Sequence, residues 1–474
     1  MVISQAQAIV FKNKPIVLTL KDAVLLSLRN NPSVQQEEIQ RVADKFALVL
    51  AKNQFQPQYA FTASNSFSHA VSSGAPSSST TWAANPSVTL ENNYGTALDL
   101  TSTNTLTNGT YNPEMELQVT QPLIRGFGKP VVDAALNNAK DTEIINRLTF
   151  KSTAISTVST VINDYLSLVQ SYQTYAVDKD SLNNYEQTVT NDRAMIAAGS
   201  MAKSDIVQAE AQVESQKATL QTDLTNIETS KNQLLNALGL PPRTPITVPK
   251  HFNFVKVEKE IEGEGGLPDL TLSSNAAVAN NIAYQQSLIT IRTLRRNLLV
   301  DQDNQRWQLN LTASETLGGG SGGGQNAGLK SLTNGSNHNE TAGLSLTVPI
   351  DDVSAQNATI DQQVSLEQAL IGLQESKRSL LETVQTDYNT VVNNKKGLKI
   401  SLDALKLQKQ TVYISEQKQL AGRVSTFEVI TNQKNLSTQL ETVVDNEISY
   451  LQSLVALEQE AGVVLEPWYV KLRY

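Results

Sequence analysis

Residues that could carry out catalysis are few and scattered in this 474-residue chain. It has no cysteine, which excludes thiolate metal sites, cysteine nucleophiles and disulfides. Its three histidines, His69, His251 and His338, lie far apart in the sequence and show no metal-ligand spacing. The glycine run at 318–324 is not followed by the Lys-Ser/Thr pair of a phosphate-binding loop, so it is interpreted as a linker. We therefore expect neither an enzyme nor a cofactor.

Charge and hydropathy exclude two further classes of protein. The formal net charge is −8, with acidic and basic residues interspersed, so nucleic acid is not an expected partner. No apolar run approaches the ~18 residues that a transmembrane helix requires. Residues 1–7 lack the basic start and apolar centre of a signal peptide. Either a signal has been removed, or the chain is not exported.

The sequence contains a long internal repeat, so the elements that position the polar residues occur twice. The Ala-Gly pair at 198–199 recurs at 421–422, which is 223 positions later. An earlier stretch, Phe-Thr-Ala-Ser at 61–64, returns as Leu-Thr-Ala-Ser at 311–314, a step of 250 positions. A repeat this long is not a stack of small solenoid units. It indicates a duplicated half-molecule, in which each half builds the same structure.

Both halves predict long helices with a coiled-coil seam. Within 155–176, apolar residues recur at alternating steps of three and four, and 384–405 follows the same plan. The two Ala-Gly pairs are predicted turns. The return helices are expected to end near Gly239 and Gly462, because each glycine follows the last periodic residue and a proline lies beyond it. Each half should hold one long antiparallel helical hairpin.

Four short segments alternate apolar and polar side chains with the period of a β-strand. They lie at 57–68, 113–123, 306–317 and 341–350. One such strand alone would suit an ordinary half-exposed sheet, but long, thin helices offer no globular core to cover four apolar faces. Lipid can cover them if the sheet closes, and four strands are too few to close alone. The pattern therefore predicts a barrel shared between several copies of the chain.

Two polar stretches separate the paired strands. Residues 68–112 are rich in Ser, Thr, Asn and Gly, with room for an extra hairpin around 88–100, and 317–339 contains the glycine run. Such segments cannot bury a core and are expected to lie in water. Long polar loops on one side of the sheet are typical of outer-membrane barrels.

The order of several short motifs resembles the TolC-type outer-membrane efflux proteins. Residues 18–23, followed by the Asn-Asn-Pro at 30–32, are similar to the opening helix of that family. Residues 198–209 and 421–430 are similar to its two periplasmic turns. The resemblance covers roughly residues 18 to 465, and it is the order of all the motifs, in duplicate, that is specific.

The strand-to-helix corner of the family has a counterpart here as well. Residues 121–128 resemble it, with Pro122 and Gly126 at the bend. A weaker echo occurs around Pro349 in the second half.

The resemblance implies a fold that is mainly α with a small β part. Long antiparallel coiled-coil hairpins would form a periplasmic tunnel, and four strands per chain would contribute to a homotrimeric transmembrane β-barrel. The implied location is the outer membrane of a Gram-negative bacterium, with a large periplasmic part. The implied function is that of a passive channel-tunnel, the exit duct of a tripartite efflux pump or a type I secretion system. Its partners would be a periplasmic adaptor (membrane fusion) protein, an inner-membrane transporter of the RND, ABC or MFS type, and outer-membrane lipid.

The expected division of the chain combines the duplication with what the resemblance implies for the residues between the repeats. It comprises an N-terminal tail at 1–17, a first repeat at 18–240, an equatorial linker at 241–267, a second repeat at 268–465 and a C-terminal tail at 466–474. Within the repeats we expect helices at 20–56 and 274–305, and helical hairpins at 128–239 and 353–461 with tips near 198–204 and 420–426.

Acidic residues near the two tips are the gate candidates that the resemblance implies. Carried over by position they are Asp205 and Glu428, and a trimer would bring three copies of each close to one axis. Crowded like charges raise each other's pKa, attract cations and favour opening. Thr431 occupies the place of a further acidic residue, so the ring should be weak. Arg423 either bridges to acidic groups of a neighbouring hairpin or is an ordinary solvated side chain.

Helix capping competes with gating for both acidic residues. Ser425 and Glu428 have the spacing of a capping box, and Ser204 with Asp205 could cap the helix that follows. Both roles stay open at this point.

The tips are also where the resemblance implies adaptor docking. The residues concerned are Gly199, Ser200, Ser204, Gly422 and Ser425. Small residues allow close helix packing, although a plain helix–helix turn would use the same types.

A non-channel protein is the alternative function. A coiled-coil structural or adhesive envelope protein would show the same helical seams. The four polar-faced strands favour the duct, because a scaffold has no use for a polar lumen. The cargo stays open between drugs, metal ions, metabolites and polypeptides.

Overall fold

The computed structural model describes residues 16–72, 74–204, 206–249, 252–262, 269–319, 325–333 and 337–470. The chain divides into two compact units. The helical unit combines residues 1–40, 148–285 and 375–474, and the sheet unit combines 41–147 and 286–374.

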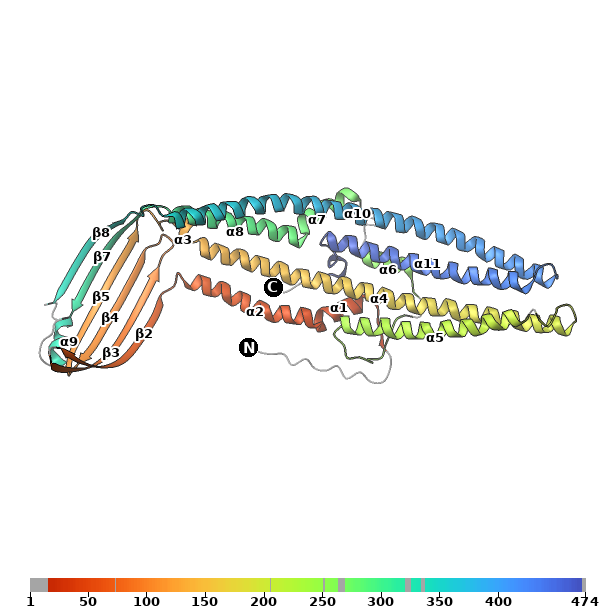
Figure 1. Ribbon diagram of the computed structural model, residues 1–474, viewed down its shortest axis with the longest axis horizontal. Helices are drawn as coiled ribbons and strands as arrows, with labels where there is room; N and C mark the ends of the chain where they lie inside the picture. Colours follow the sequence, from red (N-terminus) through yellow and green to blue (C-terminus); the bar gives the residue numbers. More distant parts are fainter. Residues whose placement is uncertain are drawn as a thin grey trace. The chain divides into compact units, whose positions relative to one another are not determined.

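Two long hairpins dominate the helical unit. Helix α4 (Ala134–Ala197) is followed by α5 (Ile206–Ala237), and α10 (Val353–Leu420) is followed by α11 (Thr426–Glu460). Their turns lie at the same end of the unit (Figure 1). The long antiparallel hairpins predicted for each half are thereby confirmed.

Shorter elements complete the chain. Helices α1 (Leu20–Asn30) and α2 (Pro32–Asn53) precede the first strands, and α7 (Leu270–Asn280) and α8 (Ile282–Asn304) repeat this pair in the second half. The remaining small elements are β1 (Ile16–Val17), which pairs in parallel with β6 (Ile246–Thr247), the helices α3 (Lys129–Val132) and α6 (Phe254–Glu262), and a 3₁₀ turn at Glu466–Trp468.

The predicted seam forms the core of the hairpins. Val158 and Ile162 of α4 and Val384 and Val391 of α10 are completely buried. The seam holds because side chains three and four residues apart lie on the same side of a helix.

All four hairpin helices end in the same backbone motif. The second residue after each helix is a glycine at positive φ: Gly199, Gly239, Gly422 and Gly462. The N–H that follows the glycine reaches back across the last turn, as from Arg423 N to Lys418 O at 2.9 Å. This Schellman geometry satisfies the final carbonyls and needs a residue without Cβ strain. The helix stops predicted at Gly239 and Gly462 are confirmed.

An asparagine ties the end of each return helix to the short helices. The Nδ2 of Asn31 donates to the carbonyl of Ala237 at 2.8 Å, and the Nδ2 of Asn281 donates to the carbonyl of Glu460 at 3.3 Å. Both asparagines occupy the break between two short helices, so the duplication extends to individual hydrogen bonds.

The glycines after α5 and α11 lie close to the same breaks. A Cβ on Gly239 would lie 2.3 Å from the carbonyl oxygen of Asn30, and one on Gly462 would lie 2.7 Å from that of Asn280. Each asparagine break with its glycine is called an Asn–Gly clasp below. Only glycine permits this approach.

The sheet unit contains one antiparallel sheet of six strands (Figure 1). In spatial order the strands are β2 (Gln58–Ser72), β3 (Ala75–Glu91), β4 (Ala97–Thr107), β5 (Thr110–Pro122), β7 (Gln308–Gly318) and β8 (His338–Thr347).

The sheet therefore has six strands where the sequence predicted four. Most of the expected outer loop at 68–112 is the end of β2, all of β3 and β4, and the start of β5. The extra hairpin considered near 88–100 exists but runs from 75 to 107. The signal was weak because β3 is built largely from small hydroxyl residues and contains Pro76 and Pro86, which argue against a strand.

The second polar stretch is also partly structured. Helix α9 (Gln325–Thr333) lies between β7 and β8 in the sequence and at one end of the sheet (Figure 1). The Leu332 side chain would be 2.9 Å from a Cβ on Gly318, at the end of β7. The expectation of a plain linker here was wrong for α9, and residues 320–324 of the glycine run lie outside the described residues.

The strand register separates a polar from an apolar face. One set of consecutive cross-strand partners, called the polar row, runs through all six strands: Gln58, Thr89, Asp99, Gln118, Ser314 and Thr341. The next residues on the first four strands form an apolar row: Tyr59, Val88, Leu100 and Leu117. Because side chains alternate along a strand, these rows lie on opposite faces.

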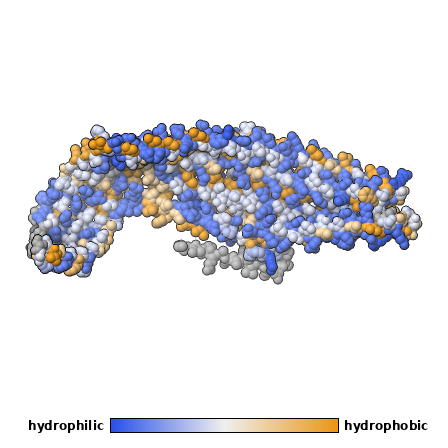
Figure 2. All heavy atoms as spheres, viewed as in Figure 1, coloured by the Kyte–Doolittle hydropathy of each residue, from blue (hydrophilic) through white to orange (hydrophobic). Residues whose placement is uncertain are grey.

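The helices also expose apolar side chains, such as Phe46 of α2 and Ile371 of α10. Across the described residues, however, no helix combines the length and the hydropathy that crossing a membrane would demand. On the face seen in Figure 2, hydrophobic side chains are scattered among hydrophilic ones along the hairpins.

Candidate functional site

The two hairpin tips carry most of the predicted site residues. Gly199 and Gly422 have φ of +74° and +65°, and open space surrounds the position of a Cβ on either. The Ser200 hydroxyl donates to the carbonyl of Met195 at 2.9 Å, and Ser204 is exposed. Asp205 lies outside the described residues. Both tips thus present small side chains on exposed turns.

The gate candidates at the second tip are all exposed. Glu428 is in the first turn of α11, and its backbone N–H donates to the Ser425 hydroxyl at 3.4 Å. This is one half of the capping box. The Thr431 hydroxyl donates to the carbonyl of Phe427 at 2.7 Å, and Arg423 projects from the turn. The Glu428 carboxylate is thus close to the positive end of a helix, which stabilises its charge.

A buried carboxylate behind the tips was missed from the sequence. Asp192 of α4 is fully buried, and its Oδ1 accepts hydrogen bonds from Gln419 Nε2 at 3.1 Å and from Thr426 Oγ1 at 3.0 Å. Gln419 is at the end of α10, and Thr426 begins α11. Asp192 therefore joins the first hairpin to the turn of the second.

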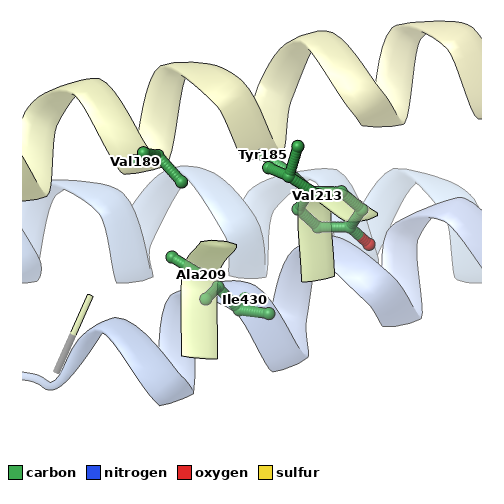
Figure 3. Packing of buried hydrophobic residues seen from close by; sticks show 5 residues of the cluster. All are labelled: Tyr185, Val189, Ala209, Val213 and Ile430. Atoms are coloured by element: carbon green, nitrogen blue, oxygen red, sulfur yellow. The ribbon is translucent and has the colours of Figure 1, made fainter. Parts of the chain in front are cut away.

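Further polar contacts join α4 to α11 along their length. They are Thr188 Oγ1 to Gln433 Oε1 at 3.3 Å, Ser181 Oγ to Ser437 Oγ at 2.8 Å, and Gln170 Nε2 to Asp445 Oδ1 at 2.7 Å. An apolar cluster lies between these contacts, built from Tyr185 and Val189 of α4, Ala209 and Val213 of α5, and Ile430 of α11 (Figure 3). The two hairpins are thus fastened to each other by alternating polar and apolar contacts.

Three carboxylates meet where α4, α5 and α11 pack together. Asp178 and Asp223 are almost fully buried, and Asp178 Oδ1 accepts from Gln216 Nε2 at 2.7 Å. Burial, together with the hydrogen bond and charge of Asp178, raises the pKa of Asp223 to about 6. Burial and the charge of Asp178 raise the pKa of Glu441 to about 7.

The strand-to-helix corner lies in the sheet unit. Pro122 ends β5, and Gly126 follows at φ +78° with its N–H donating to Asp303 Oδ2 at 2.6 Å. Asp303 is buried and also accepts from Arg306 Nη1 at 2.9 Å. Pro349 follows β8 and is half-buried. The first corner is therefore fixed by a buried carboxylate that also pairs with the exposed Arg306.

Metal chemistry finds no support in the described part of the chain. No group of three or more His, Asp or Glu side chains there is arranged to hold a metal ion. His69 Nδ1 is 2.9 Å from Ser78 Oγ on the neighbouring strand, His338 begins β8, and His251 lies outside the described residues.

A groove of about 710 Å³ lies in the helical unit between the start of α2, α4 and α5. Its lining consists mainly of hydroxyl and amide side chains, including Ser156, Thr160 and Asn236, with Asp164 as its one carboxylate. Burial raises the pKa of Asp164. The lining lacks the apolar character of a small-molecule site.

No protein-family description and no curated protein sequence matches the chain. Several solved structures do match the chain. CusC, described in a study of transmembrane channel formation, is 14% identical with a TM-score of 0.71, covering 96% of this chain and 95% of that one. The CmeC outer membrane channel of Campylobacter jejuni is 14% identical with a TM-score of 0.69, covering 94% and 85%. The MtrE outer membrane channel of Neisseria gonorrhoeae, in its open state, is 15% identical with a TM-score of 0.70, covering 94% and 89%.

These likenesses extend over nearly the whole chain, although few residues are identical. At such identities they establish architecture, and the TolC-type resemblance predicted from the motifs is confirmed at that level. The chain has the fold of the bacterial outer-membrane channels.

Proposed function

We propose that this protein is a passive outer-membrane channel-tunnel, the exit duct of a tripartite efflux pump or a type I secretion system. The polar row across all six strands carries the proposal. A sheet with one polar face, one apolar face and unpaired edges is stable in lipid when it closes around water. The likeness to outer-membrane channels favours this function over a non-channel structural or adhesive protein.

The assembly proposed is a homotrimer in the outer membrane of a Gram-negative bacterium. Its sheets meet lipid, and its hairpins extend the duct into the periplasm. A periplasmic adaptor joins it to an inner-membrane transporter, which supplies the energy.

The tips are proposed as the gate and the docking surface. Asp205 and Glu428 ring the constriction, Thr431 leaves the ring with fewer charges, and Arg423 lies beside it. The small residues of the turns, Gly199 and Gly422 among them, receive the adaptor. In support, Glu428 and Arg423 are exposed beside the second turn.

Single-channel recording tests the proposal. The protein, purified in detergent and added to planar bilayers, should give discrete, long-lived conductance steps. The control is the same preparation after thermal unfolding of the sheet. A protein that stays soluble without detergent and gives no steps would rule out the duct.

A further inference from the structure

We propose that the β3–β4 hairpin is a segment of the channel wall, so that each copy supplies six strands and three copies close a cylinder of eighteen. This inference rests on the proposed function, because closure between copies is part of it. It departs from the four strands per chain, and hence twelve in total, that the sequence resemblance implies.

The first argument is the position of the hairpin in the sheet. β3 pairs with β2 from Ser72–Ala75 at the turn down to Gln58–Thr89, and β4 pairs with β5 along all of its residues. The order β2-β3-β4-β5 places the hairpin between β2 and β5. An outer loop would leave β2 and β5 as neighbours, whereas here two strands separate them.

The second argument is that both faces of the sheet continue through the hairpin. Val88 of β3 pairs with Leu100 of β4, which pairs with Leu117 of β5, so the apolar row is unbroken. On the opposite face, Ser87 pairs with Thr101, which pairs with Glu116. A water-exposed loop has no need for such alternation, but a wall between lipid and water requires it.

The third argument is that the hairpin turn is built into the strand-to-helix corner. A Cβ on Gly95 would lie 2.5 Å from the carbonyl oxygen of Gly126. The Lys129 ammonium lies 5.2 Å from the centre of the Tyr94 ring, and the Thr96 hydroxyl donates to Gln121 Oε1 at 2.5 Å. The hairpin turn at residues 92–96 is therefore held against the corner by close packing and by a hydrogen bond.

The occupant of the free sheet edges is a second copy of the chain. Every residue of β2 and of β8 is exposed. The six strands alternate in direction, so β2 and β8 run oppositely, and β8 of one copy can pair antiparallel with β2 of the next. Such a head-to-tail contact closes into a ring and keeps the polar faces of all copies on the same side of the wall.

A barrel of eighteen strands makes the proposed duct wider. The diameter of a barrel grows roughly in proportion to its strand number, so eighteen strands give a cylinder about 1.5 times as wide as twelve. The wall that the hairpin adds is lined mainly by hydroxyl groups, with Asp99 and Glu91 as the charged side chains on the polar face. We infer a wide, hydrophilic mouth suited to bulky water-soluble cargo.

Paired cysteine variants on one strand test whether the hairpin is wall or loop. The chain has no cysteine of its own, so single substitutions can be labelled cleanly. Leu100→Cys and Thr101→Cys lie on opposite faces of β4, and Leu311→Cys and Thr312→Cys form the matched pair on β7. Each variant is reconstituted in liposomes and treated with a membrane-impermeant maleimide, or labelled with bimane in the presence of nitroxide-bearing lipids.

If the hairpin is part of the channel wall, the two cysteines of each pair should differ in labelling in the same way on β4 and on β7. T101C and T312C should react at least about tenfold faster with maleimide, and only L100C and L311C should be quenched by the lipid nitroxides. If the two β7 variants differ in labelling but the two β4 variants react alike, the hairpin is an outer loop and this inference is wrong. If the two variants react alike on both strands, the proposed membrane duct itself is wrong.

A deletion measures the width. Removing residues 74–108 joins β2 to β5 through Ser73 and Gly109 and keeps the two faces in phase. Spin labels at T312C should then lie at about two-thirds of the distance between copies found in the full chain, because the ring loses a third of its strands. An unchanged distance in a variant of unchanged oligomeric mass would contradict eighteen strands. If the deletion variant does not assemble, the cysteine pairs of the full chain decide the matter.

Discussion

The acidic side chains of this chain divide into exposed ones at the tips and buried ones behind them. Glu428 is exposed in the first turn of α11, whereas Asp192, Asp178 and Asp223 are buried between the hairpins. In the proposed duct, the exposed Glu428 is the group that meets passing ions. The buried groups hold the helices of the hairpins together, as the hydrogen bonds to Asp192 and Asp178 show.

Replacing Asp205 and Glu428 by alanine tests the gate. The double variant should lose most of its preference for cations and its block by divalent ions in planar bilayers, because the negative ring is removed. The Glu428 change leaves the Ser425 hydroxyl to cap α11. Substituting Glu375, an exposed carboxylate on α10 that is paired with Arg378, is the matched control. Unchanged ion selectivity would leave these residues with capping as their role.

Asp223 and Glu441 make stability depend on pH. Their pKa values of about 6 and about 7 lie above the ordinary values of 3.8 and 4.5, so the folded state binds more protons than the unfolded state in the interval between. The free energy of unfolding therefore falls as pH rises from about 4 to about 7. Asp178 and Asp445 face this cluster with further negative charge, and Tyr185 lies beside it.

Asp223→Asn should flatten that dependence. We expect a variant more stable by about 1 kcal/mol at pH 8 and nearly unchanged at pH 4. Thermal unfolding followed by helical circular dichroism measures it, with Asp180→Asn on the exposed face of α4 as the control. A loss of stability at pH 8 would mean that the charged form of Asp223 supports the fold.

At the scale of elements, the four helix-ending glycines have the same φ but different surroundings. Gly199→Ala meets only the backbone strain of a positive φ, which costs about 1 kcal/mol. Gly239→Ala adds a collision with the carbonyl of Asn30 and should destabilise the fold by several kcal/mol. Thermal melts of the two variants, compared with the parent, check this. Equal melting temperatures would show that the Asn–Gly clasp can relax.

Helices and turns were predictable from sequence because their signals are local. The step-of-three-and-four seam and the glycine stops identified both hairpins. The β3 strand was not, since Pro76, Pro86 and its run of serines obscure the apolar–polar alternation, which is clear only near Val88. Its place is set by pairing with β2 and β4. The change in repeat step from 250 to 223 was the available signal: the first half is longer because it contains this hairpin.

The site was less predictable than the fold. Asp192 lies in an ordinary heptad of α4, and its importance comes from Gln419 and Thr426, which are more than 220 positions away. No local pattern reports such a contact. Glu428 could be placed by its spacing from Ser425, which the structure confirms as a cap on α11.

At the scale of the whole molecule, β2 and β8 are the outer strands of the described sheet, and we expect a second copy of the chain to pair with them. Purified in detergent, the protein should have the mass of three chains over a wide range of concentrations. Native mass spectrometry or light scattering measures this, with the detergent contribution subtracted. A monomer at micromolar concentration would show that β2 and β8 need no second copy.

The two Asn–Gly clasps restrict how the hairpins can move. Each hairpin is joined by a covalent turn at one end, and at the other its return helix is hydrogen-bonded to an anchored break between short helices. A helix held at both ends cannot slide along its axis. It can only swing or bow about those fixed points, so any widening at the turns must come from pivoting. The anchored ends act as the hinge line, and the largest displacement belongs to the residues farthest from it.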